Sequence, residues 1–103
     1  MKVLEINKDN FDSIVMQSQQ KVLLDFWAPW CMPCRMVAPI VEEVAQLRPD
    51  VVVGKINVDE EMELARQFQV MSIPTLVVME NGEILSQMAG ARGRDGILDL
   101  LGE

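Results

Sequence analysis

The fold is decided by the stretch Val22-Leu23-Leu24-Asp25-Phe26-Trp27-Ala28-Pro29-Trp30-Cys31-Met32-Pro33-Cys34, in which an apolar run leads into two cysteines. Residues 22–27 are almost continuously apolar, which is typical of a strand buried on both faces. Beyond the cysteines, apolar residues recur at helical spacing and predict one inward-facing stripe: Val37, Ile40, Val41 and Val44. Pro39 lies inside this pattern and is expected to kink the helix, which should end at Arg48-Pro49.

Strand and helix patterns alternate on both sides of this stretch. Further strands are predicted at residues 3–6, 51–56, 75–79 and 84–88, and further helices around 11–15, 60–68 and 95–101. Asn7 or Asp9 can cap the first helix, and Asp59 the third. Asn81-Gly82 predicts a tight hairpin, because both turn positions favour positive φ. The order β-α-β-α-β-α-β-β-α indicates an α/β fold, with a central mixed sheet of about five strands and helices on both faces.

Length and composition are those of one ordinary domain, so residues 1–103 are expected to form a single domain. Apolar runs are too short to span a bilayer, and the first residues lack the apolar region of a signal peptide. We therefore expect a cytoplasmic protein without membrane contact. The net charge of −7 disfavours nucleic acid as a partner. The absence of histidine removes the commonest general base and the commonest zinc ligand.

The chemistry of the chain is concentrated in Cys31 and Cys34. The first turn of a helix offers unpaired N–H groups and the positive end of the helix dipole, which together lower the pKa of a thiol. Pro33 suits this turn, and the three-residue spacing places both sulfurs on one side. We therefore predict that Cys31 is the exposed attacking thiolate and that Cys34, shielded one turn further in, resolves the mixed disulfide.

Two structural explanations of the cysteine pair stay open at this point. The first is that the pair supplies two of the four ligands of a zinc site. Because the chain lacks both histidine and a third cysteine, such a site requires a dimer. A purely structural disulfide between these positions closes a very short loop and restrains the unfolded chain little. We expect no metal.

Several motifs resemble the thioredoxin family. They are Phe26 to Pro39, Lys55-Ile56-Asn57-Val58-Asp59, Ile73-Pro74-Thr75-Leu76 and Asn81-Gly82-Glu83, which match the family in its order and span nearly the whole chain. The resemblance implies the thioredoxin fold and the reduction of protein disulfides by a monomer without a bound cofactor. It also implies recycling of the cysteine pair by a thioredoxin reductase, so that NADPH acts only indirectly.

The resemblance also assigns roles behind the cysteines. Asp25 matches a buried carboxylate that accepts the proton of Cys34, and Lys55 matches a lysine that tunes this carboxylate. Burial of an anion is costly and raises the pKa of a carboxyl, which suits a proton acceptor near neutral pH. The alternative is that Asp25 ends a strand in solvent.

In front of the cysteines, the resemblance implies a cis peptide bond at Ile73–Pro74 and a shallow apolar groove for an extended substrate. The substrate-binding residues would be Trp30, Met32, Pro33, Ile73, Pro74, Gly90 and Ala91. Of the two tryptophans, Trp27 is expected to be packed and Trp30 exposed. The alternatives are that Pro74 merely begins a strand and that Trp30 is a core residue.

Met32 departs from the family pattern, which most often has glycine between the cysteines. A bias of ~1.4 kcal/mol between dithiol and disulfide shifts the potential by about 30 mV, so this position can tune the redox potential. Alternatively, Met32 is a flexible filler. Met71 and Ser72 lie where the family varies, and Met71 or Met32 can make the groove adaptable.

The predicted function is thus a protein-disulfide reductase. Two alternatives stay open. One is an oxidase or isomerase of the same fold with a more oxidising potential. The other is a non-catalytic binding subunit that uses the apolar rim.

Overall fold

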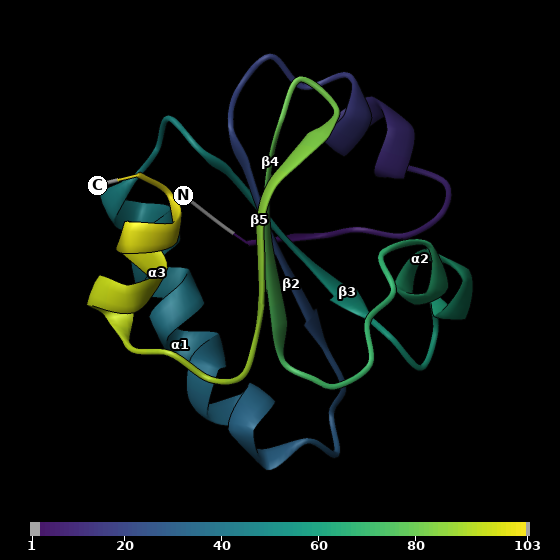
Figure 1. Cartoon of the computed structure of the whole chain (residues 1–103), viewed down its shortest axis with the longest axis vertical. Coiled ribbons are helices and arrows are strands. Elements are labelled where there is room, and N and C mark those ends of the chain that lie inside the picture. The colour runs from purple at the N-terminus through teal and green to yellow at the C-terminus, as the bar shows by residue number, and fades with distance from the viewer. Residues whose placement is uncertain (1–2, 103) are drawn as a thin grey trace.

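A five-stranded mixed sheet runs through residues 3–102, which are the residues that the computed structural model describes (Figure 1). The strands are β1 (Leu4–Glu5), β2 (Val22–Trp27), β3 (Val52–Asn57), β4 (Thr75–Glu80) and β5 (Glu83–Ala89). The helices are the π-helix η1 (Asp12–Met16) and the α-helices α1 (Met32–Leu47), α2 (Met62–Gln67) and α3 (Arg94–Leu100). The predicted α/β architecture and element order are confirmed.

The strand order is β1-β3-β2-β4-β5, with β2 in the centre. β2 pairs in parallel with β3 and antiparallel with β4. Neighbouring residues of β2 face opposite layers: Leu23 packs in the cluster with α1 and α3, and Leu24 in the cluster with η1 and α2. Both faces of β2 are therefore covered, which explains the continuous apolar run in its sequence.

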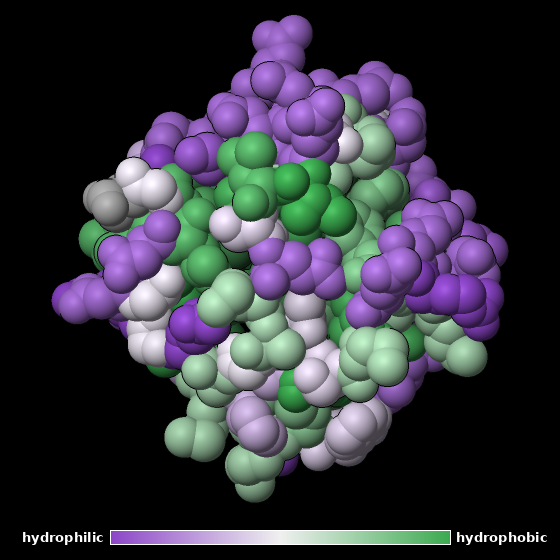
Figure 2. Space-filling view, viewed as in Figure 1, coloured by the Kyte–Doolittle hydropathy of each residue, from purple (hydrophilic) through white to green (hydrophobic). Residues whose placement is uncertain are grey.

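Helices cover the two faces of the sheet, α1 and α3 on one side and η1 and α2 on the other (Figure 1). The core beneath α1 and α3 includes Val37, Val41, Val44, Ile97 and Leu101, and the opposite core includes Val15, Phe26, Ile56, Leu64 and Phe68. At the sheet edge, β5 exposes three large apolar side chains: Ile84, Leu85 and Met88. Figure 2 shows apolar surface along this strand.

Turn signals in the sequence are well matched by the backbone. Asn81 and Gly82 have φ of 54° and 77°, so the predicted hairpin between β4 and β5 is confirmed. α1 ends at Leu47 with Arg48 as its C-cap, as the Arg48-Pro49 step predicted. Pro39 lies inside α1, and the kink there stays a prediction.

Capping was predicted less well. Neither Asn7 nor Asp9 caps the first helix: the N-cap of η1 is Phe11, which makes no side-chain capping bond. Oδ1 of Asn7 instead accepts hydrogen bonds from the N–H groups of Asp9 and Asn10, at 2.8 and 3.0 Å, in the turn before η1. The prediction for Asp59 is wrong: the N-cap of α2 is Glu61, which makes no side-chain capping bond. The carboxylate of Asp59 is bound elsewhere, by a side chain of the candidate site.

Candidate active site

The two cysteines lie where the central strand passes into the longest helix. After β2, a turn closed by the N–H of Cys31 and the carbonyl of Ala28 (3.2 Å) sets Cys31 as the N-cap of α1. Pro33 occupies the first turn of α1. The Sγ of Cys31 accepts a hydrogen bond from the N–H of Cys34 at 3.2 Å. A disulfide joins the two cysteines, whose Cα atoms lie 5.3 Å apart.

Cys31 is much less exposed than the sequence predicted. Cys31 is 5% exposed and Cys34 1% exposed, because both pack with Ala28 against Trp27, Val58 and Ile73. The difference between the two cysteines lies in what they face. Cys31 borders a wide, open pocket, whereas Cys34 borders a separate, much smaller cavity that also contacts Asp25.

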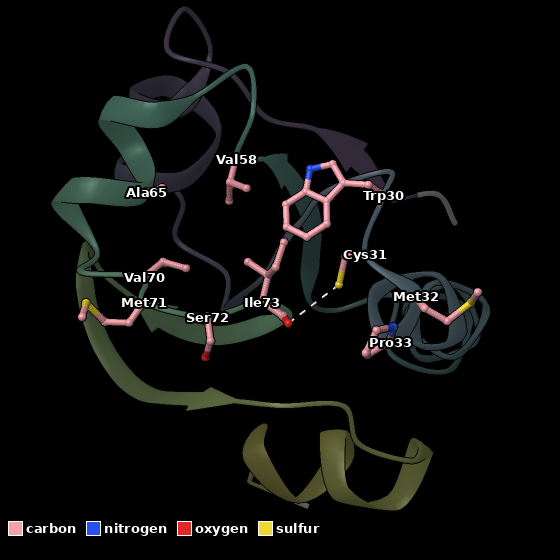
Figure 3. A pocket seen from close by; sticks show the side chains of 10 residues that line it. All are labelled: Trp30, Cys31, Met32, Pro33, Val58, Ala65, Val70, Met71, Ser72 and Ile73. Atoms are coloured by element: carbon pink, nitrogen blue, oxygen red, sulfur yellow. Dashed lines mark hydrogen bonds between the residues drawn. The ribbon is translucent and has the colours of Figure 1, made fainter.

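The open pocket beside Cys31, called here the cysteine pocket, has a volume of about 510 Å³ (Figure 3). Its lining residues are Trp30, Cys31, Met32, Pro33, Val58, Ala65, Val70, Met71, Ser72 and Ile73. The Sγ of Cys31 lies 3.7 Å from the carbonyl oxygen of Ile73, drawn as the dashed line in Figure 3. The Ile73–Pro74 bond is cis, as expected from the sequence.

The structure thus brings together four of the predicted substrate-binding residues: Trp30, Met32, Pro33 and Ile73. The other three do not line the pocket. Pro74 is buried, and its carbonyl accepts a hydrogen bond of 2.8 Å from the N–H of Gly90. Gly90 has a φ of 102°, and both it and Ala91 are exposed.

The far wall of the pocket comes from α2 and the segments on either side of it. Val58, Ala65 and Val70 were missed by sequence reasoning, because their patterns indicate only core packing. Val70 follows Gln69, whose positive φ of 56° turns the chain away from α2 and toward Ile73. The position of Val70 and Met71 just before the Ile73-Pro74 step is the signal that places them near the cysteines.

The two tryptophans lie as predicted. Trp30 is 69% exposed, and its Nε1 donates a hydrogen bond of 2.9 Å to Oδ2 of Asp59. Trp27 is half-buried, and the Nζ of Lys55 lies 5.3 Å from its ring centroid, within the range of a cation–π contact. The core-residue alternative for Trp30 is therefore wrong.

Behind the disulfide, a small, partly open cavity of about 70 Å³ borders both Cys34 and Asp25; its lining residues are Asp25, Trp27, Cys34, Arg35, Ala38 and Lys55. Asp25 is 4% exposed, which excludes the alternative of a strand end in solvent. Lys55 stands opposite Asp25 in the pairing of β2 with β3. Burial raises the pKa of Asp25 to about 7, against the opposing effect of the positive charge on Lys55. Among the described residues, Oδ1 of Asp25 has no hydrogen-bond partner.

Among residues 3–102, no group of three or more His, Cys, Asp or Glu side chains is arranged to hold a metal ion. No helix in this range is both long and apolar enough to cross a membrane.

The family model for thioredoxin matches residues 2–103. The chain belongs to the thioredoxin family. It is similar to the thioredoxin of Mycobacterium tuberculosis, with 44% identity over 92% of this chain and 83% of the relative. To the thioredoxin of Haemophilus influenzae it is 45% identical, over 87% of this chain and 85% of the relative. The thioredoxin fold predicted from the sequence is confirmed.

A longer relative is the bifunctional thioredoxin reductase/thioredoxin of Mycobacterium leprae, which is 43% identical over 92% of this chain. This chain spans only 21% of that protein. Membership of the thioredoxin family and the joined cysteine pair together make the chain a thiol–disulfide oxidoreductase, as predicted.

Proposed function

We propose that this member of the thioredoxin family reduces the disulfides of protein substrates, with Cys31 as the nucleophile and Cys34 as the resolving cysteine. The observation that carries the proposal is the joined pair at the start of α1, with Cys31 bordering the cysteine pocket. In the dithiol form, the Cys31 thiolate attacks a substrate disulfide and releases one substrate thiolate. The Cys34 sulfur then attacks Cys31, releases the second thiolate and restores the Cys31–Cys34 disulfide.

The start of α1 supports the thiolate at Cys31. The N–H of Cys34 already points at the Sγ of Cys31, and a hydrogen bond from an amide to an anionic sulfur is stronger than one to a neutral acceptor. The 16-residue helix adds the positive end of its dipole at the same place. Both effects favour the charged form of Cys31 over the thiol.

Asp25 is proposed as the acceptor of the Cys34 proton, and Lys55 as the residue that tunes this carboxyl. Cys34 must lose its proton when it attacks the mixed disulfide, and a carboxyl with a pKa of about 7 is matched to that task. The cavity that both residues line is large enough for a water molecule to relay the proton.

In front of the disulfide, the substrate chain is proposed to lie across Trp30, Met32, Pro33 and Ile73. The mainly apolar lining suits a segment of substrate next to its cysteine. Pro74, Gly90 and Ala91 are proposed to complete the site from the other side of the cis bond, where Gly90 and Ala91 are exposed.

We further propose that residues 1–103 act as one domain, as a monomer in the cytoplasm without a bound cofactor. A thioredoxin reductase would return the pair to the dithiol form, and NADPH would act only through that reductase. The Mycobacterium leprae relative supports this partner, because its name combines a thioredoxin reductase with a thioredoxin.

The test uses the variants Cys31→Ser and Cys34→Ser with insulin as the disulfide substrate and dithiothreitol as the electron donor. Cys31→Ser should abolish catalysis. Cys34→Ser, reduced first and then freed of dithiothreitol, should accumulate a mixed disulfide through Cys31 that mass spectrometry detects. Full activity of Cys31→Ser refutes the assignment. A titration against glutathione separates a reductase from an oxidase: a potential far above the cytosolic poise of about −220 to −260 mV contradicts the reductase.

A further inference from the structure

Exposed methionines surround the cysteine pair. Met32 and Met71 line the cysteine pocket, and their side chains are 60% and 93% exposed. Figure 3 shows them at opposite ends of the pocket, with Cys31 and Ile73 between them and both sulfurs turned outward. Two further exposed methionines lie nearby: Met36, one turn beyond Met32 on α1, and Met62 at the start of α2.

The apolar surface continues past Met71. A second depression of about 610 Å³ lies over α2 and includes Met62 and Met71. It shares Val58, Ala65, Val70 and Met71 with the cysteine pocket, so the two depressions adjoin. Met71 therefore stands between them, where a protein docked at Cys31 would cover it.

We propose that Met32 and Met71 form a modification site for hydroperoxides, and that their oxidation weakens the capture of protein disulfides while sparing the cysteine pair. The inference rests on the proposed function. In each reaction the O–O bond of the peroxide breaks and a sulfur–oxygen bond forms. The thioether loses two electrons and becomes a sulfoxide, and the hydroperoxide is reduced to water or an alcohol.

The disulfide form directs this reaction to the thioethers. Among the described residues no cysteine is free, so both reactive thiols are protected while Cys31 and Cys34 are joined. The accessible thioether sulfurs are then the oxidisable groups on this face. Met79, which is buried in the core, lacks that access.

Oxidation changes the pocket because a sulfoxide oxygen is a strong hydrogen-bond acceptor on a formerly apolar side chain. The far wall of the pocket, Val58, Ala65 and Val70, has no side-chain donor. The indole N–H of Trp30 is already bound to Asp59, so the hydroxyl of Ser72, on the Met71 side, is the remaining side-chain donor of the lining. A docking protein therefore covers two new acceptors where the lining offers at most one side-chain donor, and burial of an unsatisfied polar group is unfavourable.

The experiment treats the disulfide form with hydrogen peroxide, removes the peroxide with catalase and reduces the cysteines with dithiothreitol. Peptide mass spectrometry should find sulfoxide at Met71 and Met32 well before Met79. The KM for insulin should rise about fivefold, which corresponds to a binding loss of ~1 kcal/mol. Reduction of a small aromatic disulfide should change less than about twofold, because a small molecule buries little of the pocket.

The matched variants are Met32→Leu/Met71→Leu, which removes both sulfurs, and Met16→Leu/Met88→Leu, which removes two partly exposed methionines outside these pockets. Each is compared with its own untreated form. Peroxide should leave the KM of the first unchanged and raise the KM of the second as in the parent protein.

Four results overturn the inference. The first three are failure of both thioethers to oxidise, an unchanged KM after their oxidation, and an equal KM rise in the first variant. The fourth is an equal loss of activity with the small disulfide, since the damage then lies at the cysteines. If the untreated protein fails to reduce insulin, the proposed function itself is wrong.

Discussion

Replacing Asp25 by asparagine should stabilise the folded protein at neutral and alkaline pH. The carboxyl is 4% exposed, and its Oδ1 has no hydrogen-bond partner among the described residues. Its charged form is therefore poorly solvated, with Lys55 as partial compensation. Asparagine is nearly the same size and cannot ionise, so it removes the cost of the buried charge.

The magnitude follows from the pKa of Asp25, which burial raises from 3.8 to about 7. Between these values the folded state holds a proton that the unfolded state has released, so stability must fall as pH rises. The stability that the folded state gains from the proton on Asp25 is fully present below pH 3.8 and is lost by about pH 7. Roughly three pKa units at 1.36 kcal/mol each make an upper bound of about 4 kcal/mol.

The assay is urea unfolding of the disulfide form at intervals from pH 4 to pH 9, where the joined cysteines do not titrate. Stability of Asp25→Asn relative to the parent protein should grow by up to about 4 kcal/mol across this range and level off above pH 8. Asp9→Asn, at an exposed carboxylate, is the control and should track the parent protein. A difference between Asp25→Asn and the parent that is constant with pH refutes the reasoning.

Two further predictions concern the neighbours of this site and the sheet. Lys55→Met should raise the pKa of Asp25 above its present value, because the lysine lowers it; the pH range of stability loss in the same unfolding assay should move upward. Gly54→Ala should destabilise by about 1–3 kcal/mol in urea unfolding, a typical cost of overpacking. A Cβ at Gly54 would lie 2.6 Å from Cγ1 of Ile6, whereas the control Gly93→Ala meets no atom within 4 Å. Equal destabilisation of the two glycine variants would contradict the packing argument.

Local patterns predicted those parts of the fold that depend on neighbouring residues. The apolar run of residues 22–27 predicted a strand covered on both faces, and this is where β2 lies. Asn81-Gly82 predicted the hairpin because its two positive φ angles are a property of the turn itself. The start of α1 at the cysteines is likewise local, since Cys31 and Pro33 suit a cap and a first turn.

The predictions that failed depend on contacts between residues far apart in the sequence. Asp59 satisfies the local pattern of a helix cap, yet its carboxylate binds Trp30, 29 residues away in the sequence. The low exposure of Cys31 depends on Val58 and Ile73, which only the folded chain brings to it. The far wall of the cysteine pocket was missed for the same reason, because Val58 and Val70 look like ordinary core residues in the sequence.

The arrangement of the two cysteines also bears on the order of the proposed steps. Their exposures are both small, so exposure alone does not distinguish an attacking sulfur from a resolving one. The spaces that they face do distinguish them. A substrate disulfide has access through the open pocket to Cys31, beside the carbonyl of Ile73. The small cavity on the other side of the disulfide borders both Cys34 and Asp25. In the proposed mechanism, attack therefore begins at Cys31. Asp25 takes the proton of Cys34 only after the mixed disulfide has formed.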